Sequence, residues 1–251
     1  MYSLVYFSPT GNTKYLMKKL ADLLIIEEPN IHALEFVKYE ELINNDHLII
    51  MYPIHGFNPP RTVNRFVKNL PEGLYENVSL IAVGCNDLWL NDAVAINLRK
   101  VVEKKKYEIV VDEILTMPLT LVMDFPEDVK VKTIDEASNK IIEISEKIKN
   151  SEVSNRVVKL KSKLIHTIGK IESPAARMFG LELHAKKNCT SCSICWNNCP
   201  EFNIKRGKNN KPKFGFSCSM CMRCIYSCPE KAITPYISKF LTIKNGYKLE
   251  D

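Results

Sequence analysis

Eight of the nine cysteines in this 251-residue chain lie in two runs that share one spacing. The first run is Cys189-x2-Cys192-x2-Cys195-x3-Cys199-Pro200, and the second is Cys218-x2-Cys221-x2-Cys224-x3-Cys228-Pro229. Three thiolates spaced two residues apart on a tight loop can bind three corners of an iron–sulfur cubane, which leaves the fourth corner to a more distant cysteine. The spacing therefore predicts two [4Fe–4S] clusters.

Two other interpretations of the cysteines are weaker. A disulfide framework needs an oxidising compartment, and the first residues, Met1–Phe7, lack the basic region and long apolar core of an export signal. Zinc often binds paired Cys-x2-Cys motifs, but zinc sites seldom carry a third cysteine at the same spacing and a trailing Cys-Pro. Zinc is therefore the main alternative to iron and sulfur.

The end of the second run, Cys224-Ile-Tyr-Ser-Cys-Pro-Glu-Lys-Ala-Ile233, resembles the ferredoxins that hold two [4Fe–4S] clusters in one small domain. In those proteins the fourth cysteine of each run binds the other cluster. The resemblance implies one ligand set of Cys189, Cys192, Cys195 and Cys228 and a second set of Cys218, Cys221, Cys224 and Cys199.

The N-terminal segment carries a second site signature. Residues 2–7 are mostly apolar, as in a buried parallel strand, and Ser8-Pro9-Thr10-Gly11-Asn12-Thr13-Lys14 precedes an amphipathic run from Tyr15 to about Ile25. Loop N–H groups, a helix N-terminus and hydroxyl side chains together bind anions. Gly11 permits a close backbone approach to such a ligand. The alternative is a simple cap, because Ser and Thr favour helix starts in any case.

The segment Phe-Ser-x-Thr-Gly-Asn-Thr at 7–13 resembles the FMN-phosphate loop of flavodoxins. The alternation that follows fits their fold. It predicts strands near Ala33–Val37, His47–Tyr52, Val78–Gly84 and Ile109–Leu115, and helices near Thr62–Asn69 and Asn91–Lys104. A closing helix is predicted from one apolar face, formed by Ile134, Ala137, Ile141, Ile144 and Ile148.

These patterns predict an α/β, flavodoxin-like, doubly wound sheet of five parallel strands, followed by a small α+β domain with two clusters. The expected boundaries are 1–150 for the FMN-binding domain, 151–180 for a helical connector, and 181–251 for the cluster domain and a C-terminal tail. In the connector, apolar residues recur at helical spacing and predict a helix between the domains with a solvated basic side: Val153, Val157, Leu160, Leu164, Ile165 and Ile168. The alternative for its basic side is a docking surface for an acidic carrier.

Ligands of this fold lie at the carboxyl ends of the strands. The expected FMN contacts are therefore three loops: Ser8, Thr10, Gly11, Asn12 and Thr13; Pro53, Ile54, His55, Gly56 and Phe57; and Gly84, Cys85, Asn86, Asp87 and Trp89. In flavodoxins the second and third of these loops embrace the isoalloxazine ring, usually with a stacked aromatic side chain. Phe57, His55 and Trp89 are the candidates for stacking. For Cys85 the more ordinary interpretation is a small core residue at the end of a buried strand.

The formal charge of +6 invites a nucleic-acid interpretation. Two oxidised clusters would remove about 4 charge units, and a flavin phosphate would remove about 2 more, so the loaded protein would be near neutral. Lysines around the clusters then fit cluster charge or an acidic redox partner better than DNA. No apolar run approaches the roughly 20 residues of a membrane span, and a cytoplasmic location is expected.

The whole chain resembles proteins that fuse a flavodoxin-like domain to a C-terminal two-cluster ferredoxin domain. Membership implies FMN, two [4Fe–4S] clusters and intracellular electron transfer with a reductase, ferredoxin or flavodoxin-type partner. The alternative is a flavin-dependent reductase of a small organic substrate, such as a quinone, nitro compound or porphyrin precursor. No catalytic residue is assigned, because no general acid/base pair stands out, and the carrier is favoured.

Overall fold

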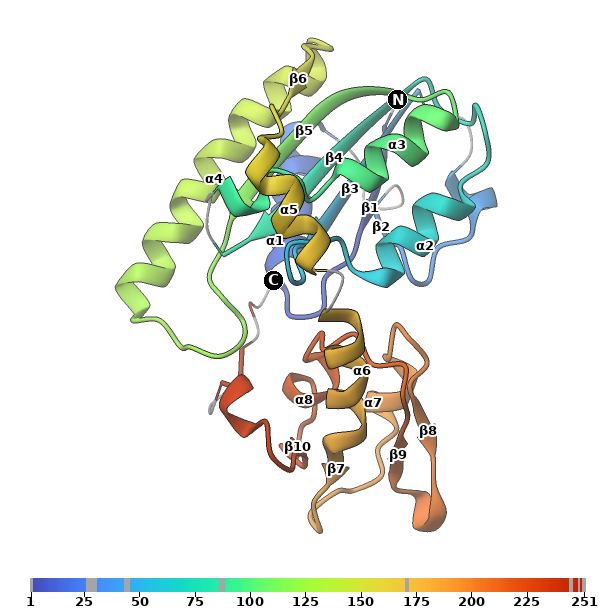
Figure 1. Cartoon of the computed structure of the whole chain (residues 1–251), viewed down its shortest axis with the longest axis vertical. Coiled ribbons are helices and arrows are strands. Elements are labelled where there is room, and N and C mark those ends of the chain that lie inside the picture. Colours follow the sequence, from blue (N-terminus) through green and yellow to red (C-terminus); the bar gives the residue numbers. More distant parts are fainter. Residues whose placement is uncertain are drawn as a thin grey trace.

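A parallel sheet with helices on both faces forms the first lobe of the computed structural model (Figure 1). The structure describes residues 2–25, 31–42, 46–85, 89–169, 172–243, 246–247 and 249. The sheet order is β2-β1-β3-β4-β5-β6, with every neighbouring pair parallel. The strands are β1 (Tyr2–Tyr6), β2 (Ile31–Ala33), β3 (His47–Pro53), β4 (Asn77–Gly84), β5 (Glu108–Thr116) and β6 (Ser154–Asn155). The order 2-1-3-4-5 of the first five strands is the flavodoxin-like doubly wound order.

Two apolar cores lie on the two faces of this sheet. Helices α1 (Asn12–Leu23) and α4 (Glu127–Lys149) cover one face, and α2 (Arg61–Asn69) and α3 (Ile96–Lys104) cover the other. The predicted apolar face of the closing helix is confirmed, because Ala137, Ile141, Ile144 and Ile148 are all buried on α4. Short 3-10 turns, η2 (Tyr39–Leu42) and η3 (Trp89–Asn91), complete this lobe.

Three expectations about this lobe were wrong in detail. The sheet has six strands instead of five, because Ser154–Asn155 adds a two-residue β6 beside Val111 and Asp112 of β5. The strand expected at Ala33–Val37 lies earlier, at Ile31–Ala33. The connector does not begin as a helix: α5 spans Leu160–Gly169, after β6, and α6 spans Glu172–Glu182.

The connector also packs with its polar side inward. Ser162 and His166 of α5 are buried, whereas the apolar residues expected to pack are exposed: Val153, Val157, Leu160 and Leu164. The side chains of Ile165 and Ile168 lie outside the described part of the structure. Polar contacts therefore fix the connector to the first lobe.

A buried ion cluster anchors β6 to the sheet. Asp112, which is 1% exposed, accepts from Arg156 at 2.6 Å and from Arg99 at 3.2 Å. We expect Asp112→Asn to lower the free energy of unfolding by about 3–5 kcal/mol, because both guanidinium groups lose a buried partner. Urea unfolding checks this. Asp135→Asn, an exposed change on α4, should shift the same quantity by less than about 0.5 kcal/mol, and an equal shift would contradict the account.

The second lobe contains both cysteine runs and an internal repeat. Its elements are α6, β7 (Leu183–Ala185), α7 (Ile194–Asn197), β8 (Ile204–Arg206), η4 (Lys208–Asn210), β9 (Pro212–Phe214), α8 (Arg223–Tyr226), β10 (Ile233–Pro235) and η5 (Lys239–Leu241). The elements β7, α7 and β8 recur 29 residues later as β9, α8 and β10, the same offset that relates Cys189 to Cys218.

The two repeats exchange strands. β7 pairs antiparallel with β10, and β8 pairs antiparallel with β9 in a hairpin. Each small sheet thus takes one strand from each half of the repeat, which ties the two halves together. Phe179, Leu183, Met222 and Ile233 form the buried apolar core of this lobe. No helix in the described ranges is long and apolar enough to cross a lipid bilayer.

Candidate functional site

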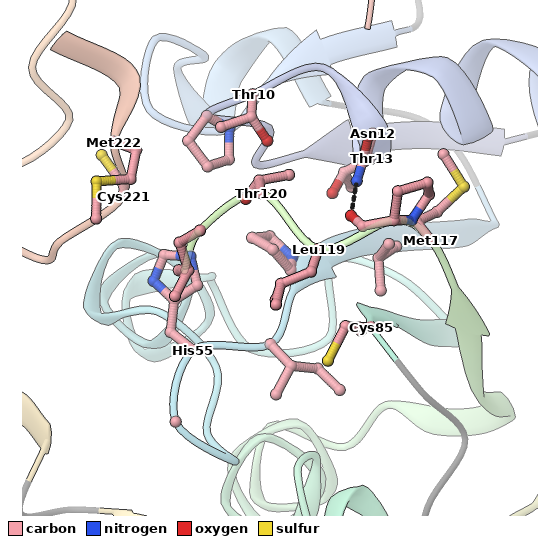
Figure 2. A pocket seen from close by; sticks show the side chains of 18 of the residues that line it. Thr10, Asn12, Thr13, His55, Cys85, Met117, Leu119, Thr120, Cys221 and Met222 are labelled. Carbon is pink, nitrogen blue, oxygen red and sulfur yellow. Dashed lines mark hydrogen bonds between the residues drawn. The ribbon is translucent and has the colours of Figure 1, made fainter. Parts of the chain in front are cut away.

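A cavity of about 340 Å³ lies at the carboxyl ends of β1, β3, β4 and β5, against the second lobe (Figure 2). This is the edge where the strand order reverses and where doubly wound folds bind their ligands. The volume falls within the usual range for small-molecule sites. The lining residues are Pro9, Thr10, Asn12, Thr13, Pro53–Phe57, Val83–Cys85, Asn91, Met117–Leu121 and Met220–Met222.

The Ser8–Thr13 loop brings a helix start to this cavity. Thr10 and Thr13 line it, and α1 begins at Asn12. The first N–H groups of a helix have no partner within the helix, and here that of Lys14 bonds to Ser8 Oγ at 3.0 Å. Ser8 therefore supports the loop instead of lining the cavity.

The sequence suggested that Gly11 lets a ligand approach the backbone closely. In the structure a distant segment of the chain occupies the space where a Gly11 Cβ would lie. The Gly11 φ of 107° favours glycine, and a Cβ placed there would lie 2.5 Å from the backbone oxygen of Leu249. The close approach that glycine permits is thus made by a distant part of the chain.

Tyr247 and Leu249, which we call the strap, fasten the loop from outside. The Leu249 N–H donates to Thr10 O at 3.2 Å. The Tyr247 hydroxyl donates to Asn12 Oδ1 at 2.5 Å, while Asn12 Nδ2 donates to Pro118 O at 2.9 Å. Asn12 therefore joins the loop, the segment after β5 and the strap.

The turn after β3 has two consecutive residues with positive φ, Gly56 (47°) and Phe57 (64°). His55 and Asn58 exchange backbone hydrogen bonds of 2.9 Å on either side of it. Such a conformation is strained for phenylalanine, at a cost of about 1–3 kcal/mol, and persists only where neighbouring groups impose it.

Helix α5 supplies those neighbouring groups. Asn58 Nδ2 donates to His166 O at 3.2 Å, and the His166 ring lies with Nδ1 3.4 Å from Phe57 O and Nε2 2.9 Å from Asn97 Nδ2. No sequence pattern predicts this role, because His166 is a lone histidine in the connector. The polar side of α5 thus holds the turn that lines the cavity.

His55 connects the same turn to the second lobe. Its ring packs edge-on against Phe7, with centroids 6.5 Å apart. Burial lowers the pKa of His55 to about 4, and a hydrogen bond to the Ser219 backbone raises it in part. The ring is therefore neutral at pH 7, so it adds no charge to the buried contact between the two lobes.

The third expected loop is described only in part. Gly84 and Cys85 line the cavity, whereas Asn86 and Asp87 lie outside the described residues. The backbone of Trp89 begins η3, but its side chain is also outside the description. Cys85 is exposed, so the expectation that it packs as a core residue was wrong.

The second lobe completes the cavity with residues that sequence reasoning missed. Met220, Cys221 and Met222 approach from one side, and Met117 lies on the opposite side (Figure 2). Asn91 and the segment that begins at Met117 also line the cavity and were not among the expected contacts. No local pattern marks Met220 and Met222, because only the docking of the lobes brings them to the strand ends.

Two smaller cavities divide the eight cysteines into the sets that the ferredoxin resemblance implies. We call them the proximal site and the distal site, by their distance from the large cavity. The proximal site is lined by Cys199, Cys218, Cys221 and Cys224. The distal site is lined by Cys189, Cys192, Cys195 and Cys228.

The loops of the two sites have the same backbone shape. Ser191 and Ser193 have φ of 60° and 71°, and their repeats Met220 and Met222 have φ of 51° and 60°. These left-handed residues turn the chain tightly between successive cysteines. The fourth cysteines are also matched, because Asn203 donates its N–H to Cys199 Sγ and Ala232 donates its N–H to Cys228 Sγ, both at 3.3 Å.

The surroundings of some of these thiols favour the protonated form. Burial, together with the charge of neighbouring cysteines, raises the pKa of Cys218 to about 12 and that of Cys195 to about 11. Metal cations that replaced the protons on these sulfur atoms would stabilise the thiolate form and so offset the raised pKa. In the described ranges no three His, Cys, Asp or Glu side chains converge on one metal ion. A cubane distributes its ligands over four irons, so its ligands need not converge on one point.

Polar contacts join the lobes beside the cavity. Arg223, between two proximal cysteines, donates to Ser8 O at 3.0 Å, pairs with Glu35 at 2.5 Å, and lies over the Phe7 ring. On α2, Arg61 donates to Cys218 O at 3.0 Å. These contacts set the proximal site against the Ser8–Thr13 loop.

Comparisons with solved structures find likeness to the N-terminal part of the chain. No family model and no curated protein matches the chain. Among solved structures, a flavodoxin from the domain Archaea is 16% identical over 59% of this chain and 99% of its own, with a TM-score of 0.39. The flavodoxin of Streptococcus pneumoniae is 17% identical over 58% and 98%, with a TM-score of 0.40. The two-electron reduced flavodoxin of Megasphaera elsdenii is 16% identical over 56% and 99%, with a TM-score of 0.39. The fold assignment rests on the strand order of the chain itself.

Proposed function

We propose that this chain is an electron-transfer protein that relays electrons between FMN in the large cavity and two [4Fe–4S] clusters at the proximal and distal sites. One observation carries the proposal: Cys221 lines both the large cavity and the proximal site. A flavin in the first would be next to a cluster ligand of the second.

The large cavity fits a flavin nucleotide. Thr10, Thr13 and the start of α1 supply hydroxyl and N–H donors for a phosphate. Apolar groups such as Ile54, Met117 and Leu119 line the remainder and suit a flat ring. The neutral His55 adds no charge to this apolar part.

The cysteine sites fit cubanes in ligand number and in hydrogen bonding. Each has four thiols, and N–H groups already point at the sulfurs of Cys199, Cys218 and Cys228. Hydrogen bonds to sulfur are among the groups that set cluster potentials. Clusters exchange single electrons and flavin exchanges one or two, so the pair would join one-electron to two-electron traffic.

The deciding experiment is anaerobic purification, with iron and flavin quantified, followed by reductive titration monitored by absorbance and EPR. We expect near one FMN and about eight irons per chain. Eight irons without flavin would reject the relay, and zinc in place of iron would reject the cluster assignment. Rapid turnover of a quinone or nitro compound would favour the reductase alternative.

The hydroxyl of Thr13 gives a sharper test of the cavity. We expect Thr13→Val to weaken FMN binding by roughly 10- to 150-fold, because a hydrogen bond to a charged group is worth about 1.5–3 kcal/mol. Fluorescence titration of the flavin-free protein measures the dissociation constant. Thr133→Val on α4, whose hydroxyl bonds only within its helix at 2.8 Å, is the matched control. Equal affinity of both variants would exclude Thr13 from the site.

A further inference from the structure

Positive charge is concentrated in the second lobe. Residues 181–251 contain twelve lysines and arginines against five acidic residues, whereas residues 1–180 contain 23 against 24. The whole excess of the chain therefore belongs to the part that carries the cysteines. Lysines lie beside the distal site, whereas the cations next to the proximal site are the arginines Arg61 and Arg223.

The turns beside the distal site bring these charges together. Lys186 and Lys187 precede Cys189, with Asn188 between, and the Lys186 N–H donates to Ala232 O at 2.8 Å, which places Lys231 alongside. Lys211 of the β8–β9 hairpin reaches the Lys186 and Lys187 carbonyls at 3.4 Å. We call the resulting surface the basic face. Its members are Lys186, Lys187, Lys208, Lys211, Lys213 and Lys231.

The basic face is open to solvent and turned away from the first lobe. Lys186, Lys187, Lys208, Lys213 and Lys231 are exposed, and within the described residues none of the six makes an ion pair with a carboxylate. Figure 1 shows the hairpin turn and the turn after β7 at the pole opposite the sheet. A cluster of unpaired like charges repels itself, which favours binding of a partner that neutralises it.

The distal site is also more exposed to solvent than the proximal site, which favours electron transfer with a partner protein. Cys192 is exposed, whereas the other seven cluster cysteines are partly buried. The large cavity lies at the other end of the second lobe, beside Cys221. Since electron transfer weakens steeply with distance, a protein partner would reach this chain best at the distal site.

Resting on the proposed function, we infer that the basic face is the docking surface for a small acidic redox protein of the ferredoxin or flavodoxin kind. Its carboxylates would pair with Lys186, Lys187 and Lys231 around the exposed Cys192. Each encounter moves one electron: the partner is oxidised by one as this chain is reduced by one, or the reverse, and no bond forms. Lysine pairs of this kind act mainly on the association rate.

The test is binding and electron transfer with an acidic two-[4Fe–4S] ferredoxin as the probe, under anaerobic conditions. We expect the association constant and the second-order rate to fall about tenfold or more between 20 mM and 300 mM salt. Lys186→Glu combined with Lys187→Glu should lower both by about tenfold or more at 20 mM salt and flatten their salt dependence. Binding is measured independently of electron transfer by biolayer interferometry.

The matched control reverses Lys100 and Lys104, two exposed residues of α3, and so changes the net charge equally. This variant should bind ferredoxin with an association constant within about twofold of the wild-type value. Helix α3 lies on the first lobe, farther from the basic face than the roughly 10 Å over which screened charges interact. Equal losses in both double variants would overturn the docking surface. A second outcome would also overturn it: a DNA duplex binds the wild-type protein at 150 mM salt but not the Lys186/Lys187 double variant, and ferredoxin binding is the same for both proteins.

Iron content, flavin content and bleaching by dithionite are measured in every sample. A wild type without iron or without bleaching means that the proposed function has failed. A wild type with both cofactors and normal bleaching, but with salt-independent ferredoxin kinetics, means that only the docking surface has failed.

Discussion

Cys221→Ser should cost this protein about four of its eight irons and disconnect the flavin from the distal site. The reason is the double position of Cys221, which lines both the large cavity and the proximal site. Serine keeps the shape of the side chain but is a poor ligand for iron. Iron analysis, EPR and the order of bleaching in a reductive titration measure the loss.

Two other cysteine variants make this prediction specific. Cys192→Ser, at the exposed end of the distal site, should also remove about four irons but leave the flavin coupled to the proximal site. Cys85→Ala should keep all the iron, because Cys85 belongs to neither cysteine set. Far-UV circular dichroism shows whether each variant is folded. A folded Cys221→Ser protein with full iron content would disprove the ligand assignment.

Arg223→Gln should loosen the contact between the lobes and release flavin at a lower urea concentration. The guanidinium pairs with Glu35, which is 3% exposed, and also donates to Ser8 O and Asn198 O. Without it a buried carboxylate is left unpaired, which costs about 3–5 kcal/mol. The midpoint of urea-induced flavin release, followed by fluorescence, measures the loss.

A double-mutant cycle with Glu35 separates the ion pair from the other contacts of Arg223. Glu35→Gln removes the buried charge. The stability loss of the double variant should therefore be smaller than the sum of the two single losses by about 0.5–3 kcal/mol. Additive losses would show that Arg223 acts through its contacts with Ser8, Asn198 and Phe7 and not through Glu35. Lys132→Gln on α4, a solvent-exposed helical pair with Glu136, should shift the midpoint little.

The order of strands and helices in the first lobe could be predicted because each element carries its own pattern. His47–Pro53 is a continuous apolar run that is buried along almost its whole length, and α4 shows its buried face in its 3.6-residue period. β6 could not be predicted in this way. It has two polar residues, and it is held by Arg156 reaching Asp112 across the sheet edge.

Local patterns also allowed part of the sites to be anticipated. The spacing predicts which three cysteines of each run share a loop, and a strand followed by Ser8–Thr13 indicates an anion site, whereas the exchange of the fourth cysteines is what the ferredoxin resemblance implies. The contributions of Met222, His166 and Tyr247 depend instead on contacts between segments far apart in the chain. His166 was hidden because it lies in a connector whose apolar pattern suggested that the opposite side of the helix would be buried.

If FMN binds in the large cavity as proposed, the strap would link its loading to the order of synthesis. Tyr247 and Asn12 lie 235 residues apart, so a ribosome exposes the Ser8–Thr13 loop long before it makes the strap. During that interval the first lobe can already pair its strands, because the last of them, β6, ends at Asn155. The loop is therefore open while the second lobe is still being made. It becomes fastened only after both cysteine runs have emerged, which would make flavin retention report on the completion of the iron–sulfur lobe.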